Sequence, residues 1–146
     1  MNHDSILLSI KPMYAEMIFN GKKTIELRRK LPKNINKGSL ILVYASSPQK
    51  LLLGAFTVKK IISSPLISLW EKVNKKSCID MKDFDTYFSG CKIGYGICID
   101  NYWSFPNPVS LEDIRTIDEG FNIPQSFRYL KESDLHLFSY QLGIVF

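Results

Sequence analysis

Turn-forming residues recur along this chain at intervals of roughly ten to fifteen residues, and this spacing constrains the fold more than any other feature. Asn20-Gly21, Leu31-Pro32 and Ser64-Pro65 each separate one apolar stretch from the next. Elements between such turns are short, which is typical of a compact domain with brief strands and helices. No internal repeat, low-complexity tract or linker interrupts the pattern, so residues 1–146 are predicted to form one domain.

Strands are expected to dominate the core, with helices between them. Extended segments are predicted where β-branched and aliphatic residues gather, at 6–11, 24–29, 39–45, 51–62 and 92–99, with a bulge at Gly54. Helices are predicted from Pro12 to Asn20-Gly21, at 64–75 and 81–88, from Ser110, and at 124–130, whereas 133–146 fits either state. Strands and helices alternate too irregularly for a doubly wound sheet, so the predicted fold class is α+β with a small mixed barrel.

The basic residues concentrate in the first half of the chain. Up to Ser64 there are 11 Lys and Arg against 3 Asp and Glu, whereas the remainder carries 8 against 11. Such an asymmetry predicts a positive face that attracts phosphate-bearing partners. A lysine-rich solvated surface would give the same count, so the charge alone does not assign a nucleic acid as the partner.

Cysteine, histidine and apolar content narrow the class of protein. The 3 cysteines form no Cys-x-x-Cys pair, and only His3 and His136 are available beside them, so neither a metal site nor a cofactor is predicted. The thiols are expected to be reduced and buried. No segment approaches the ~18 consecutive apolar residues of a membrane helix. Met1 to Asp4 lack the basic start of a secretory signal. We therefore expect a cytoplasmic protein without a membrane partner.

The densest polar cluster lies directly behind the first predicted helix. Gly21, Lys23, Glu26 and Arg28 spell Gly-x-Lys-x-x-Glu-x-Arg. Three flanking segments accompany it in order along the chain: Leu8-Ser-Ile-Lys-Pro12, Val43-Tyr-Ala-Ser-Ser-Pro48 and Pro124-Gln-Ser-Phe127. Together with these flanks, the pattern resembles the signature of the ASCH family (activating signal cointegrator homology).

The resemblance implies a PUA-like mixed β-barrel with short flanking helices and a basic cleft between the first helix and the barrel strands. It also implies an association with RNA, so the expected partner is single-stranded RNA or a modified nucleotide or nucleoside. Some members of the family resemble small hydrolases that act on nucleic acid or on acylated cytidine nucleosides.

Nine residues in these segments are candidates for nucleotide binding. Lys11, Lys23 and Arg28 suit phosphate or carbonyl oxygens, with the guanidinium of Arg28 offering a planar fork. Glu26 suits an exocyclic amine or a ribose hydroxyl, and Tyr44 is predicted to stack on a base, an interaction worth ~1–3 kcal/mol. Neutral hydrogen bonds to base edges are expected from Ser9, Ser46, Gln125 and Ser126.

The spacing of the motif poses a geometric condition. Glu26 and Arg28 share one face of a regular strand, whereas Lys23 has the opposite parity. Lys23 and Glu26 line one cleft only if Lys23 lies in the turn before the strand, which Gly21-Lys22 favours, or if a bulge intervenes. A purely structural alternative is that Glu26 and Arg28 neutralise each other as an ion pair.

Binding is the preferred function, and hydrolysis is the alternative. In a hydrolase, Lys23 and Glu26 would be the catalytic pair, because a desolvated lysine beside a carboxylate activates a hydroxyl or stabilises an oxyanion. A metal-independent ribonuclease stays open, since Lys, Tyr and Ser together can cleave RNA through its own 2′-hydroxyl. In the amidohydrolase-like branch a threonine nucleophile stands where this chain has Glu26, which argues against that activity. A transcription-related interaction module is a further alternative, without a DNA-reading motif to support it.

Overall fold

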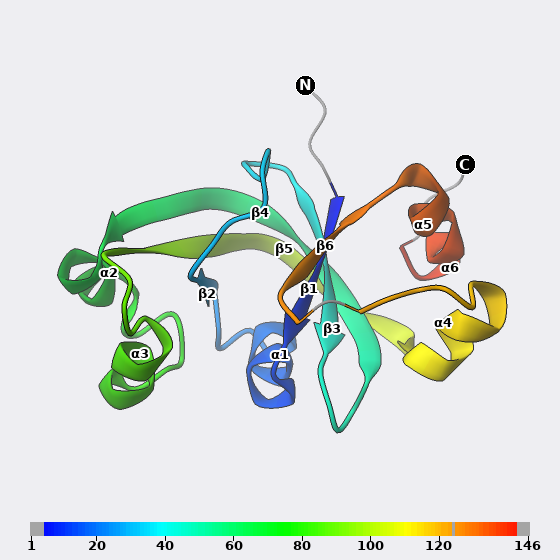
Figure 1. Ribbon diagram of the computed structural model, residues 1–146, viewed down its shortest axis with the longest axis horizontal. Coiled ribbons are helices and arrows are strands. Elements are labelled where there is room, and N and C mark those ends of the chain that lie inside the picture. The colour runs from blue at the N-terminus through cyan, green and yellow to red at the C-terminus, as the bar shows by residue number, and fades with distance from the viewer. Residues whose placement is uncertain (1–4, 124, 143–146) are drawn as a thin grey trace.

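The computed structural model describes residues 5–123 and 125–142. Within these residues, six strands and six helices follow one another along the chain, and Figure 1 shows the strands gathered at the centre with short helices around them. The strands are β1 (Ser5–Ile10), β2 (Ile25–Arg28), β3 (Leu40–Ala45), β4 (Leu51–Pro65), β5 (Ile93–Ser110) and β6 (Phe127–Leu130). The helices are α1 (Pro12–Phe19), α2 (Leu66–Val73), α3 (Met81–Tyr87), α4 (Leu111–Ile117), α5 (Glu132–Leu137) and α6 (Ser139–Leu142).

The strands form one mixed sheet in the order β2-β5-β4-β3-β1-β6. The β1 strand pairs in parallel with β3, and the other neighbours pair antiparallel. The two edges of the sheet are joined by side chains: the Arg28 guanidinium on β2 donates to Ser126 Oγ at 2.7 Å, just before β6. The backbone N–H of Lys33 donates to the Tyr129 hydroxyl at 2.6 Å. The predicted fold class, α+β with a small mixed barrel and short flanking helices, is confirmed as a mixed six-stranded sheet surrounded by short helices.

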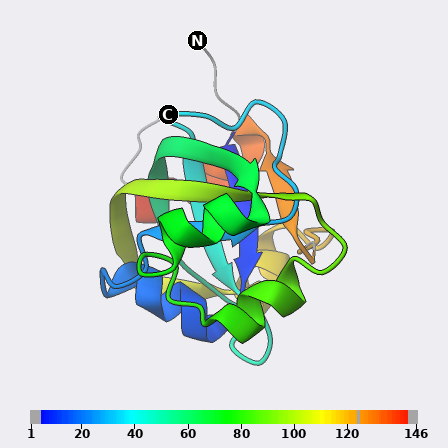
Figure 2. The same cartoon turned by 90° about the vertical axis from the view of Figure 1, so that its left-hand side faces the viewer.

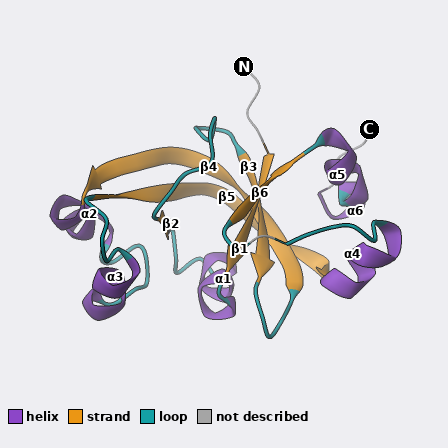
Figure 3. Ribbon diagram, viewed as in Figure 1, coloured by secondary structure: helices purple, strands orange, loops and turns teal. Residues whose placement is uncertain are grey.

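The two longest strands, β4 and β5, pair with each other over most of their length (Figure 3). The sequence predicts only 51–62 and 92–99, because bulges interrupt the alternation of side chains: the register shifts at Leu52/Gly54, Phe56/Val58 and Val58/Lys60. The irregularity expected at Gly54 is confirmed. A Cβ there would lie 2.3 Å from the Trp103 carbonyl oxygen, so only glycine allows the strands to approach this closely.

Apolar side chains form three clusters, and each cluster contains residues from both the sheet and the helices that pack on it. The α1 helix contributes Ala15 and Ile18 to the first cluster, which also contains Ile6 and Val43 from the sheet. The α2 and α3 helices cover β2 and one end of β5, with Leu69 and Phe84 buried there. The C-terminal helices cover the other end, so the two helical groups lie at opposite ends of the sheet (Figure 1).

The segment before the last strand corrects one expectation. Residues 124–130 are predicted as a helix, but Phe127–Leu130 is strand β6, with Leu8 opposite Phe127 and Ser5 opposite Leu130. The free edge of β1 supplies backbone partners that a short local helix could not match. Pro124 lies outside the described residues, as do 143–146; within 133–142 the chain is helical.

The remaining sequence expectations concern thiols and membrane segments. The three cysteines are free thiols; Cys98 is buried, as predicted, whereas Cys78 and Cys91 are half-buried. In the described part of the chain, no helix has the length and apolar character needed to cross a membrane.

Candidate functional site

A cavity of about 450 Å³ opens between α1, α3 and the end of β2. Figures 1 and 2 show α1 and α3 on the same side of the sheet, with β2 beside them. The residues that line the cavity come from five separate segments: Ser9, Ile10, Lys11, Met13, Tyr14, Lys23, Glu26, Leu27, Arg28, Ser46, Ile79, Asp83, Tyr87 and Gln125. The cleft that the sequence predicts beside the first helix therefore exists, and α3 forms its second wall.

The turn between α1 and β2 places Lys23 in this cavity. Asn20 caps α1, and Gly21 follows with φ of +82°, a conformation that glycine adopts without steric cost. The Lys23 N–H then donates to the Met17 carbonyl at 2.9 Å, so the chain folds back beneath the helix before β2 begins. Lys23 thus lies in the turn, which is the condition for it to share the cavity with Glu26.

Three charged side chains form a connected row along the wall of the cavity. Lys23 Nζ lies 3.6 Å from Glu26 Oε1, and Arg28 donates to Glu26 Oε2 at 3.3 Å. Only 3% of Lys23, 5% of Glu26 and 8% of Arg28 is exposed, so each charge depends on its neighbours. The ion pair of the structural alternative is therefore present, and it also lines the cavity.

Lys23 has a further set of contacts that set its protonation. Its ammonium donates to the Ser77 carbonyl and lies 4.9 Å from the centre of the Tyr14 ring. Burial lowers the pKa of Lys23 below its ordinary value, and the Glu26 carboxylate opposes this change without cancelling it. The cavity therefore contains an amine that loses its proton more readily than a lysine in water.

A family model described as the ASCH domain matches residues 8–129. The chain belongs to the ASCH family. The family resemblance read from Gly21 to Arg28 and its flanks is thereby confirmed.

Two relatives and one solved structure show how far this ASCH chain resembles known proteins. The ASCH domain-containing ribonuclease of Zymomonas mobilis is 25% identical over 128 residues, which cover 88% of this chain and 85% of that protein. Large ribosomal subunit protein uL22 of Ureaplasma parvum is 29% identical over 129 residues, which cover 88% of this chain. The chain spans only 40% of the length of that uL22 protein.

The crystal structure of ASCH from Zymomonas mobilis superposes on the present fold. The TM-score is 0.86 at 24% sequence identity, and the superposition covers 93% of this chain and 94% of that chain. This likeness shows that the chain shares the fold of that ASCH structure.

Seven of the predicted nucleotide-binding residues of the ASCH domain meet at the cavity. They are Ser9, Lys11, Lys23, Glu26, Arg28, Ser46 and Gln125. Ser126 is not among the lining residues; its hydroxyl and carbonyl oxygens accept from the Arg28 guanidinium at 2.7 and 3.3 Å. Ser126 therefore orients Arg28, which in turn lines the cavity.

Tyr44 corrects the prediction of a stacking ring. It is 3% exposed and packs in the apolar cluster with Leu7, Leu52 and Phe105, outside the cavity. Burial raises the pKa of Tyr44, and the positive charge of Arg115 on α4 acts against this rise. Its ring thus offers no open face to a base and faces the C-terminal helices instead, because residue 44 falls on the outer side of β3.

Two other tyrosines line the cavity and were missed as site residues. Tyr14 comes from α1, where the sequence pattern assigns it to an apolar stripe, and Tyr87 comes from α3. Burial raises the pKa of both phenols. Asp83 and Tyr87 are four residues apart on one helix face, a signal of a shared surface, but only the fold shows which surface they face.

Proposed function

We propose that this ASCH domain binds single-stranded RNA and holds one unstacked nucleotide in the cavity between α1, α3 and β2. The observation that carries the proposal is the row of buried charges along an accessible cavity. Buried charges are costly, and a domain of this size stabilises itself more readily with apolar side chains. A cavity of about 450 Å³ also falls in the range of pockets that hold small ligands.

The lining residues supply the contacts that one nucleotide requires. Arg28 and the exposed Lys11 offer cations to phosphate or carbonyl oxygens, and Glu26 accepts from an exocyclic amine. Tyr14 on α1 and Tyr87 on α3 add two aromatic rings to the lining. Single-stranded nucleic acids are held in this way, by bases stacked on aromatic rings beside a positive groove.

The relatives support RNA as the class of ligand. One is named a ribonuclease and another a ribosomal protein, and both match nearly nine-tenths of this chain. Their identities, 25% and 29%, leave the particular ligand to be tested on this protein.

Binding is tested by titrating a labelled single-stranded RNA of about ten nucleotides, a length within the usual range of site sizes. We expect saturable binding that weakens with salt and that falls several-fold in Lys11→Gln, which removes a charge from the exposed rim. Lys92→Gln is the matched control, because Lys92 is exposed and lies outside the cavity. Equal losses in both variants, or no binding by the wild type, would contradict the proposal.

A ribonuclease that uses the RNA's own 2′-hydroxyl is the second candidate, favoured by the lowered pKa of Lys23. A neutral Lys23 amine accepts the proton of the 2′-hydroxyl, whose oxygen then attacks the adjacent phosphorus. The bond to the 5′-oxygen of the next nucleotide breaks, and that oxygen takes a proton from water, while the Lys23 ammonium later returns its proton to solvent. The products are a 2′,3′-cyclic phosphate and a free 5′-hydroxyl. The Arg28 guanidinium, which lines the same cavity, would stabilise the negative charge on the phosphate oxygens.

Cleavage is tested with the same RNA in the presence of a chelator. We expect Lys23→Met to bind RNA but to leave it intact, while the wild type yields fragments that end in a cyclic phosphate. Unchanged cleavage by Lys23→Met would exclude Lys23 as the base. Cleavage lost on chelation alone would point to a metal-dependent reaction.

The amidohydrolase and interaction-module alternatives gain nothing from the geometry. Thr24 is exposed and does not line the cavity, so the nucleophile of an amidohydrolase is not supplied by that residue.

A further inference from the structure

The α3 helix contributes a carboxylate to the lining of the first cavity. Asp83 lies in the first turn of α3, is exposed to solvent and lines the cavity. The cations of the lining, Lys11, Lys23 and Arg28, come from the start of α1 and from β2 with the turn before it. A negative charge in a site for nucleic acid weakens the attraction of phosphate. Asp83 therefore costs affinity unless its carboxylate contacts another part of the ligand.

The Asp83 carboxylate differs from that of Glu26 in having no cation of its own. Glu26 Oε1 lies 3.6 Å from Lys23 Nζ, and Glu26 Oε2 accepts from Arg28 at 3.3 Å. Within the described residues, the Asp83 side chain takes part in no salt bridge. The cap of α3 uses only the backbone N–H of Asp83, which donates to Asp80 at 2.8 Å. Both oxygens of the Asp83 carboxylate are therefore available to a ligand.

Tyr14 on α1 lies within the electrostatic reach of the same carboxylate. Burial raises the pKa of the Tyr14 phenol, and the negative charges of Asp83 and Asp80 raise it further. The phenol therefore keeps its proton and is able to donate a hydrogen bond. The first cavity thus offers a ligand an acceptor with two oxygens, at Asp83, and a neutral donor, at Tyr14.

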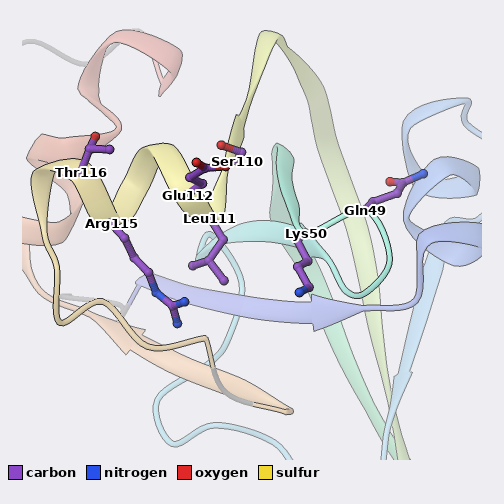
Figure 4. A pocket seen from close by; sticks show the side chains of 7 residues that line it. All are labelled: Gln49, Lys50, Ser110, Leu111, Glu112, Arg115 and Thr116. Atoms are coloured by element: carbon purple, nitrogen blue, oxygen red, sulfur yellow. The ribbon is translucent and has the colours of Figure 1, made fainter.

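A second cavity, of about 620 Å³, has a different arrangement of charge. It lies between the end of the turn that joins β3 to β4 and the first two turns of α4 (Figure 4). The charged ends of Lys50 and Arg115 extend to the same side, whereas Glu112 lies at the other end. Among the described residues that line it, none is aromatic. Ser46 lines the first cavity and Lys50 the second, so a single turn separates a cavity with a carboxylate and phenols from one without phenols.

We propose that Asp83 selects guanine as the base held in the first cavity. The inference rests on the proposed function, because it names the base within the same RNA ligand. The Watson–Crick edge of guanine presents two adjacent donors, the N1–H and the N2 amine, which match the two oxygens of a carboxylate. The third group on that edge, the O6 carbonyl, accepts a hydrogen bond from a hydroxyl such as that of Tyr14.

The other three bases match a carboxylate less well. Uracil places its single N–H between two carbonyl oxygens, whereas adenine and cytosine each place a ring nitrogen with a lone pair beside the amine. These oxygens and lone pairs repel the oxygens of a carboxylate. A site built to accept from two donors also rejects a ligand that lacks one of them, because a polar group of the site is then left unpaired. Asp83 therefore discriminates both by attraction to guanine and by repulsion of the other bases.

The preference is measured with labelled RNAs of about ten nucleotides, a length within the usual range of site sizes. They consist of uridine except at one central position, which is guanosine, adenosine, cytidine or uridine. We expect the wild type to bind the guanosine RNA about tenfold more tightly than the uridine RNA, since a bidentate contact to a base edge discriminates to about that extent. An RNA with inosine at the central position lacks the N2 amine and should bind with intermediate affinity.

The variant Asp83→Asn keeps the size of the side chain and replaces one acceptor oxygen with a donor. We expect the preference for guanosine to disappear, chiefly because the guanosine RNA binds more weakly. Asp85→Asn is the matched control, since Asp85 is exposed on the same helix and does not line the cavity. It should keep the preference of the wild type. A purely structural role of Asp83 would weaken the binding of all four RNAs by the same factor, and thermal unfolding establishes that each variant is folded.

Three contrary results separate the inference from the proposed function. If the wild type binds all four RNAs equally, and Lys11→Gln weakens the binding of each, then guanine selection is wrong and the proposed function stands. If Asp83→Asn keeps the preference for guanosine, another group reads the base and the role of Asp83 is wrong. If the wild type binds none of the RNAs, the proposed function fails and the selection of guanine fails with it.

Discussion

At the scale of single residues, Lys23 carries the most unusual environment in the described chain. One ammonium group contacts a backbone carbonyl at Ser77, a carboxylate at Glu26 and the ring of Tyr14. Each contact favours the charged form, yet burial outweighs them and lowers the pKa of Lys23. The protonation of Lys23 is therefore set by the balance between its burial and its charged neighbour Glu26.

The lowered pKa of Lys23 predicts a specific dependence of stability on pH. Because the unfolded chain holds the Lys23 proton more tightly than the folded protein does, the unfolded state binds more protons in the range that ends near the ordinary value of 10.5. The free energy of unfolding of the wild type should therefore rise with pH in that range, relative to Lys23→Met. Urea titrations of both proteins over a pH series measure this difference. A constant difference would mean that the pKa of Lys23 is not lowered.

Glu26 separates two buried cations, so its removal should be costly. Glu26→Ala leaves Lys23 and Arg28 without their shared carboxylate, and we expect a loss of about 3–5 kcal/mol in the free energy of unfolding. Glu26→Gln keeps two hydrogen-bonding atoms in place and should lose less. A loss near zero in both variants, measured by denaturant unfolding, would show that the row of charges does not stabilise the fold.

At the scale of elements, the short helix α3 depends on Asp80, the residue that caps its N-terminus. The Asp80 carboxylate accepts from the Asp83 N–H at 2.8 Å and caps the helix that carries Tyr87 into the first cavity. Asp80→Ala should destabilise the protein by about 1 kcal/mol. It should also weaken RNA binding, because the first turn of α3, which forms one wall of the cavity, would unwind. Asp85→Ala, an exposed change on the same helix, is the control for charge alone. Equal effects of both changes on unfolding would contradict the role of the cap.

The β4–β5 pair depends on the bulge at Gly54. Gly54→Ala places a Cβ 2.8 Å from the Phe19 ring and still closer to the Trp103 carbonyl, so we expect a loss of about 1–3 kcal/mol in stability. Gly120→Ala is the matched control, because the nearest atom to its Cβ would be 3.9 Å away. Comparable midpoints of thermal unfolding for the two variants would mean that the strands move apart at little cost.

At the scale of the whole molecule, the contact between Arg28 and Ser126 closes the sheet. It joins β2 at one edge to the start of β6 at the other. Ser126→Ala should lower the free energy of unfolding by about 1 kcal/mol or more, since a hydrogen bond to a charged group is lost. Amide hydrogen exchange should accelerate in β6 more than in β4, whereas the exposed change Ser89→Ala should alter neither. If Ser126→Ala accelerated amide exchange equally in β6 and β4, the contact between Arg28 and Ser126 would not be what holds β6 in place.

The sequence predicts the parts of the site that lie close together along the chain. Lys23, Glu26 and Arg28 fall within one turn and one strand, so strand parity states the condition under which they share a cavity, namely that Lys23 precedes the strand or that a bulge intervenes. Asp83 and Tyr87 reach the same cavity from about sixty residues away, and no local pattern indicates that α3 packs there. Tyr44 fails for a related reason: its parity on β3 selects the outer face, which a family motif does not reveal.

The error at residues 124–130 has the same origin. An isolated segment of that composition suits a helix, but the open edge of β1 gives it a ladder of backbone partners. Lys50 and Arg115 likewise show no shared pattern in the sequence, because a turn and a helix separated by two long strands bring them to one cavity. Pairing between distant segments therefore determines what the local pattern leaves open.

The turn from Ser46 to Lys50 also bears on how ASCH proteins can diverge. The Ser46 carbonyl accepts from the N–H groups of both Gln49 and Lys50, so an added residue would displace these hydrogen bonds. Replacing its side chains leaves the two cavities the same distance apart, whereas an insertion or deletion changes that distance. We therefore expect relatives that keep both cavities to change this turn by substitution and not by insertion.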